Sequence, residues 1–162
     1  FYGNAALDVL RENPYILASD HIGGEFSEAD ALALELGFEA DSPERIAAAV
    51  IFELVHNSGN GHCFIPREKL IDATSALIHV DPYRVADGLD MLADRGEVVR
   101  EQIAEVDGCY LRRLYEAEVY TARKIAEMAC SLFKTGPEIE SFIAQIESEQ
   151  GISFAPQQRR IL

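Results

Sequence analysis

The sequence predicts a mainly α-helical protein made of a helix-hairpin-helix module, a winged-helix-like module with a small β-hairpin, and a helical connector. Three observations lead to this fold class. Apolar residues recur at helical spacing along most of the chain, and strand-like runs are confined to residues 62–111. The chain has 162 residues, of which 48% are hydrophobic, so it can bury a core as one domain or as small modules packed together.

Residues 1–60 are expected to form the helix-hairpin-helix module. Asn4 can cap a short first helix, and Pro14 can open a turn directly after it. A glycine-containing hairpin follows. Ser27 can cap the next helix, which Gly37 ends as a glycine beyond the last helical turn.

The third helix of this module has a clear start and a clear end. Ser42-Pro43-Glu44 supplies a capping residue, a first-turn proline and a first-turn acid. The apolar stripe that follows, at spacing i, i+4, consists of Ile46, Val50 and Leu54. Residues 58–61 (Ser-Gly-Asn-Gly) stop the helix, which places a module boundary near residue 60.

Residues 61–112 are expected to form the winged-helix-like module. Its expected elements are a strand at 62–65, a helix at 67–78, a helix capped by Asp81-Pro82 that ends before Gly96, and strands at 97–103 and 109–111 around a turn at Asp107-Gly108. Strand, helix, helix and two-stranded hairpin is the order of a winged helix.

Residues 113–150 are expected to form a helical connector. Two helices are predicted, at 113–133 and 138–150, and Gly136-Pro137 separates them. Residues 151–162 are too few to form a domain alone.

The net charge of −14 argues against DNA binding on charge alone, because a negative protein repels phosphate. The charge is uneven: residues 1–60 hold 11 acidic and 2 basic side chains, so any basic surface is expected after residue 60. No apolar run reaches the roughly 20 residues of a membrane helix, and no secretory leader is recognisable. We therefore expect a cytoplasmic protein with no membrane contact.

The cysteines and histidines do not predict a metal centre. Cys63, Cys109 and Cys130 are odd in number and far apart, so neither a disulfide framework nor a zinc ribbon is expected, and we interpret them as reduced core residues. His62 and Cys63 are adjacent, so on a strand they would point to opposite faces. No catalytic residue is predicted.

Four segments, in order along the chain, together resemble one protein family. They are Glu12–Gly37 with its Asn-Pro-Tyr-Ile-Leu start, Asn60–Leu70, Tyr115–Glu118 and Gln150–Gln158. This combination resembles the RecD-like DNA helicases, the family of the exodeoxyribonuclease V alpha subunit, and it covers nearly the whole chain.

The resemblance implies a longer protein that is an ATP-dependent 5′ to 3′ DNA helicase of superfamily 1, in which these residues precede the motor. The pattern G-x-x-x-x-G-K-[ST] does not occur in the sequence, so no cofactor is expected here, and ATP and Mg²⁺ would belong to the motor. Residues 151–162 would be the start of that motor. Gln158 aligns with the family glutamine that reads the adenine ring.

Two surfaces are candidates for binding DNA. In a helix-hairpin-helix, backbone amides near the second helix hold a phosphate, which here indicates Gly23, Gly24, Phe26 and Ser27, although Glu25 would repel it. The second surface is a group of arginines around the wing: Arg95, Arg100, Arg112 and Arg113.

The second helix of the winged-helix-like module is not expected to read bases. It carries Asp87, Asp90 and Asp94 against Arg84 and Arg95, whereas major-groove reading requires Arg, Lys, Asn or Gln.

These residues leave three functions open. The first is a region that positions single-stranded or junction DNA beside the motor domains of the same polypeptide, without reading sequence. The second is a protein-interaction or regulatory module that docks on the motor or a repair partner without binding DNA. A free-standing winged-helix transcription regulator ranks last, because its reading helix is acidic.

Overall fold

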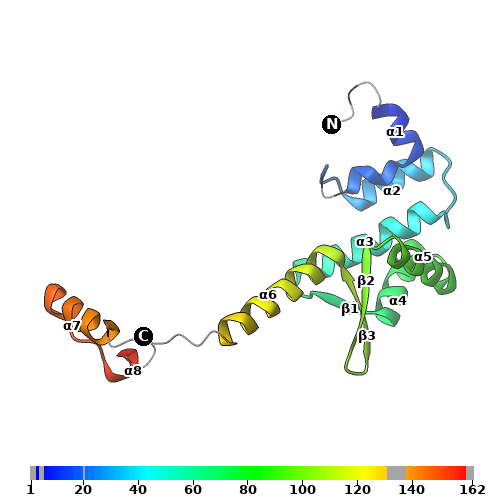
Figure 1. Ribbon diagram of the computed structural model, residues 1–162. Helices are drawn as coiled ribbons and strands as arrows, with labels where there is room; N and C mark the ends of the chain where they lie inside the picture. Colours follow the sequence, from blue (N-terminus) through cyan, green and yellow to red (C-terminus); the bar gives the residue numbers. More distant parts are fainter. Residues whose placement is uncertain (1–2, 4–5, 20, 131–137, 160–162) are drawn as a thin grey trace. The chain divides into compact units, whose positions relative to one another are not determined.

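Figure 1 shows the computed structural model of the chain, which describes residues 3, 6–19, 21–130 and 138–159. Contacts divide the chain into two compact units, Phe1–Thr121 and Ala122–Leu162. The predicted fold class is confirmed: the chain is mainly helical, with one small three-stranded antiparallel sheet. The finer division predicted from the sequence, with boundaries at residues 60, 112 and 150, stays a prediction.

The first unit begins with a short α-helix, a 3-10 helix and a second α-helix. These elements are α1 (Ala6–Glu12), the 3-10 helix η2 (Pro14–Ala18) and α2 (Phe26–Glu35). The prediction that Ser27 caps α2 is wrong. The extended backbone of Glu25 brings the chain into the helix at Phe26, so Ser27 is already its second residue. The predicted cap at Asn4 lies outside the described residues.

Helix α3 (Pro43–Gly59) begins as predicted. The Ser42 hydroxyl accepts a hydrogen bond from the Arg45 backbone N–H at 3.3 Å, and Pro43 occupies the first turn. Ile46, Val50 and Leu54 are all buried, which confirms the predicted apolar stripe.

The sheet and the two helices beside it follow the predicted order. The elements are β1 (Phe64–Pro66), α4 (Arg67–Ile78), α5 (Pro82–Asp94), β2 (Val98–Ile103) and β3 (Val106–Leu111). The strands are arranged in the order β1-β3-β2, all antiparallel. This arrangement is consistent with a winged-helix-like part, and α3 packs on it in the place of its first helix.

The predicted turn at Asp107-Gly108 is wrong. The hairpin turns at Ala104, whose φ is +52°, and Gly108 lies inside β3 opposite Glu101. A Cβ at Gly108 would lie 2.9 Å from the Ile103 side chain and 3.0 Å from that of Phe64. The glycine is therefore present because side chains of both neighbouring strands cross it, not because the chain reverses there.

Helix α3 is the central element of the first unit (Figure 1). It contacts η2 and α2 on one side, and α4, α5, β1 and β3 on the other. One continuous apolar cluster includes Phe26 from α2, Val50 from α3 and Leu89 from α5. The N-terminal helices and the winged-helix-like part therefore share a core.

A buried arginine on α3 connects these parts by polar contacts. Arg45 donates to both carboxylate oxygens of Asp30 on α2, at 2.8 and 2.9 Å. It also donates to the carbonyl oxygens of Ala40, at 2.6 Å, and of Ile78 at the end of α4, at 3.0 Å. The Tyr15 hydroxyl donates to Asp30 at 2.8 Å. This network joins η2, α2, α3 and α4 through the paired side chains of Arg45 and Asp30.

Helix α6 (Arg112–Cys130) starts directly after β3 and spans the division between the units. The second unit also contains α7 (Glu138–Gln150) and α8 (Pro156–Arg159). The Phe154 backbone N–H donates to the Glu147 carboxylate at 2.7 Å, which holds the segment between these two helices against α7. The predicted end of the connector helix at residue 133 lies outside the described residues. None of the described helices is long and apolar enough to cross a bilayer.

The prediction that all three cysteines are core residues is wrong for two of them. Cys109 on β3 is fully buried, but Cys63 and Cys130 are exposed. Cys63 comes just before β1, because the strand starts two residues later than predicted, at Phe64. Burial, with the negative charge of Asp107, raises the pKa of the Cys109 thiol to about 11, so it is protonated at neutral pH.

We predict that Arg45→Ala destabilises the chain by about 2–4 kcal/mol, somewhat less than for a fully buried pair, because it leaves the partly buried carboxylate of Asp30 without its partner. The matched control is Arg84→Ala, which breaks an exposed ion pair with Asp41 and should cost less than about 1 kcal/mol. Urea unfolding measures both. Equal losses of unfolding free energy in the two variants would show that Arg45 matters no more than an exposed ion pair.

The same network predicts how stability depends on pH. Burial alone would raise the pKa of Asp30, but hydrogen bonds from Arg45 and Tyr15 outweigh it and hold the pKa below its ordinary value. The stabilisation is therefore present above the unfolded pKa of about 3.9 and is lost as the pH falls through the lower folded value. Unfolding free energies of the unmodified chain and of Asp30→Asn should converge in acid; a gap that widens there would refute this.

Candidate nucleic-acid interface

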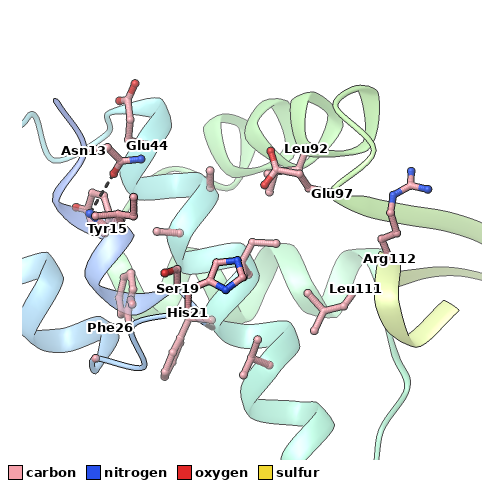
Figure 2. Close-up of a pocket in the computed structure, with 18 of the residues that line it drawn as sticks. Asn13, Tyr15, Ser19, His21, Phe26, Glu44, Leu92, Glu97, Leu111 and Arg112 are labelled. Atoms are coloured by element: carbon pink, nitrogen blue, oxygen red, sulfur yellow. Dashed lines mark hydrogen bonds between the residues drawn. The ribbon is translucent and has the colours of Figure 1, made fainter. Parts of the chain in front are cut away.

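One groove in the first unit is lined by both of the regions that the sequence indicates for DNA binding. It encloses about 1090 Å³. Gly23, Gly24 and Phe26 line it at the hairpin, and Arg95, Arg112 and Arg113 line it near the wing. Figure 2 shows Tyr15 and Phe26 on one side, Leu111 and Arg112 on the opposite side, and His21 between them. Folding thus brings together residues about 70 to 90 positions apart in the sequence.

The hairpin amides are not arranged as the sequence suggests. The N–H groups of Gly23 and Gly24 donate to the carbonyl oxygens of Ser19 and Leu17, both at 2.8 Å. They hold the hairpin together and cannot also bind a phosphate. No described residue accepts a hydrogen bond from the N–H groups of Phe26 and Ser27 at the start of α2, so these two amides are the ones that could.

Close packing explains the second glycine of the hairpin. A Cβ at Gly24 would lie 2.7 Å from the Leu17 carbonyl oxygen, which is far inside contact distance. Gly23 has a φ of +75° and open space around its Cα. The first glycine therefore provides the backbone turn, and the second allows η2 and the hairpin to approach each other.

The floor of the groove is an apolar face of α3 that the sequence reading missed. Its residues are Ala47, Ala48, Ile51, Phe52 and Val55. Three of these residues repeat at spacing i, i+4 and are shifted by one position from the buried stripe of the same helix. The same i, i+4 spacing of Ala47, Ile51 and Val55 is present in the sequence, and it indicates that α3 is apolar on more than its core face.

A stack of aromatic rings fixes one part of this floor. Phe52 stacks on Phe26, with ring centroids 5.1 Å apart, and on His56, at 5.9 Å. Phe26 in turn stacks on Tyr15 at 6.1 Å. Phe52 therefore contacts two other rings, and these contacts help to fix its position in the floor of the groove.

The arginines at the other end differ in their contacts. Arg112 donates to the Gly96 carbonyl oxygen and forms an ion pair with Glu116 at 3.4 Å. No described residue forms an ion pair or hydrogen bond with the exposed side chain of Arg95. Arg95 is therefore available to an anion without breaking an existing contact.

Acidic residues also line the groove, and they limit what it can hold. Glu25 and Glu44 lie towards the hairpin end, and Glu97 and Glu116 lie among the arginines. Three arginines against two glutamates leave the wing end slightly positive, whereas the hairpin end is negative. Any phosphates would therefore lie towards the wing end.

Three of the predicted site residues lie elsewhere. Arg100 is 3.0 Å from Asp90 and 2.5 Å from Asp107, so it is part of a surface ion-pair network rather than an open cation. Ser27 does not line the groove. Gln158 belongs to the second unit, where its side-chain oxygen accepts a hydrogen bond from the Ala155 N–H at 2.9 Å.

The acidic face of α5 has a structural explanation in part. Asp90 pairs with Arg67 as well as with Arg100, and Arg84 pairs with Asp41. These contacts hold α5 against its neighbours. They also engage Arg84, which could otherwise have contacted a base. Across the described residues, no three His, Cys, Asp or Glu side chains are grouped in a way that could hold a metal ion.

The fold is consistent with a helix-hairpin-helix region joined to a winged-helix-like part. Residues 1–64 match the family model described as the ATP-dependent RecD2 DNA helicase HHH domain. The match covers α1, η2, the hairpin, α2 and α3, and it ends as β1 begins. The N-terminal part of the chain is therefore similar to the helix-hairpin-helix region of a RecD2-type helicase.

We predict that Gly24→Ala destabilises the chain by about 1–3 kcal/mol, because the new methyl group forces the Leu17 carbonyl away and opens the hairpin. Gly59→Ala is the control: its Cβ meets nothing within 4 Å, and alanine suits the end of α3, so stability should be unchanged or slightly higher. Chemical denaturation compares the two. A Gly24→Ala chain as stable as the control would show that the close approach does not matter.

Proposed function

We propose that this chain is the DNA-binding and DNA-positioning region that precedes the motor of a RecD-like, superfamily 1, ATP-dependent 5′ to 3′ DNA helicase. The observation that carries the proposal is the shared groove, which the hairpin and the wing arginines line together. The helicase context comes from the match of residues 1–64. The direction of unwinding rests on the resemblance of the sequence alone.

In this proposal the groove holds DNA without reading its sequence. Arg95 and Arg113 contact phosphates at the wing end. These contacts recognise the backbone, which is the same for every sequence. Movement along DNA would come from the motor domains of the same polypeptide.

ATP and Mg²⁺ would be bound by the motor and not by these residues. The sequence lacks the phosphate loop, and the side-chain oxygen of Gln158 is already bonded to Ala155. No step of ATP hydrolysis is therefore assigned to this chain.

The competing function is a module that docks on the motor or on a repair partner without binding DNA. The net charge of −14 and the exposed side chains of Tyr83 and Met91 on α5 favour it. The two functions differ in where binding would occur, because protein docking through α5 would not involve the groove.

We predict that the chain binds a fluorescent DNA oligonucleotide at low salt, and that Arg95→Gln weakens this binding about fivefold through the loss of one phosphate contact. Arg84→Gln removes the same charge outside the groove and should change the Kd less than twofold. Anisotropy titrations at several salt concentrations should give a slope of log affinity against log salt of about −1.5, as expected for about two phosphates neutralised by arginines.

Two results would count against the proposal. If no oligonucleotide binds at low salt, the chain is not a DNA-binding region. If Arg84→Gln weakens binding as much as Arg95→Gln, DNA is bound by general surface charge and not by the groove.

A further inference from the structure

The groove has a feature that backbone recognition leaves unused: most of its lining surface is apolar. On α3 it consists of the half-buried side chains of Ala47, Ile51, Phe52 and Val55. The almost fully buried side chains of Leu92 and Leu111 add little to it. Apolar surface that stays partly exposed is stabilised when apolar groups of a ligand cover it. Phosphates and sugars cannot supply them.

The two forms of DNA differ in whether they can cover this wall. In a duplex the faces of the bases are stacked inside the helix, and the outer surface is sugar and phosphate. In a single strand the bases are unpaired, and their flat faces can pack on apolar side chains while the backbone stays near cations. The groove has an apolar floor with arginines at one end, which suits a single strand better than a duplex.

The size and charge of the groove point the same way. A volume of about 1090 Å³ lies just above the usual range for small-molecule sites, so the groove can take a few nucleotides but does not enclose a double helix. The arginines outnumber the glutamates at the wing end by one, so phosphate attraction is weak. Base contacts must then supply much of the affinity.

We infer that the groove binds a short stretch of unpaired DNA strand, with bases against the apolar wall of α3 and phosphates towards Arg95 and Arg113. This inference rests on the proposed function and adds the form of DNA and its orientation. Because Phe52 already stacks on Phe26 and His56, bases pack mainly against the aliphatic side chains of Ile51 and Val55.

The test compares three fluorescent probes on the full chain at one low salt concentration. They are a single-stranded oligothymidine of about 12 nucleotides, an abasic strand of the same length, and a blunt duplex. We expect the oligothymidine to bind at least about fivefold tighter than either of the others, because only it offers free bases. Ile51→Ala should remove most of this preference, and Leu34→Ala, an exposed apolar residue of α2 outside the groove, should keep it.

The outcomes separate this inference from the proposed function. If duplex or abasic DNA binds as tightly as oligothymidine and Arg95→Gln still weakens binding, the DNA-binding function stands and the base-binding groove is refuted. If none of the probes binds, both fail. Because the abasic comparison uses the unmodified chain, it remains decisive even where Ile51→Ala folds poorly.

Discussion

The ion pair between Arg45 and Asp30 determines how the parts of the first unit are placed. One guanidinium reaches α2, the loop before α3 and the end of α4, and Asp30 also accepts from Tyr15 on η2. Removing two charges from water offsets much of their attraction, so such a pair adds little net stability, although losing one partner is costly. Its main consequence is geometric: the hairpin is held at a fixed position beside the winged-helix-like part.

That fixed position creates the groove. The hairpin and the wing arginines contribute opposite sides, and α3 supplies the floor. A helix that packs only on a core presents one apolar stripe, but α3 carries two, shifted by one residue. The buried stripe, which contains Val50, holds the unit together, and the stripe that contains Ile51 faces the groove. Stability and binding surface are thus provided by adjacent positions of the same helix.

Local patterns in the sequence were enough to predict most elements, because caps, prolines and periodicity act within a few residues. The cap at Ser42 and the order of α4, α5 and the two strands show this. What failed depends on contacts between distant residues. Gly108 looks like a turn residue until Ile103 and Phe64 are seen to cross it, and Arg100 looks like an open cation until Asp90 and Asp107 are placed beside it. The groove itself could not be predicted, because the contacts that place the hairpin opposite the wing join residues far apart in the sequence.

The most direct test of this account is an NMR titration of the labelled chain with oligothymidine. If the groove is one binding surface, backbone amides of residues 21–27 and of residues 95–97 and 111–113 should shift together and fit a single Kd. Shifts confined to the exposed face of α5, or separate affinities for the two sides, would contradict the claim that hairpin and arginines form one site.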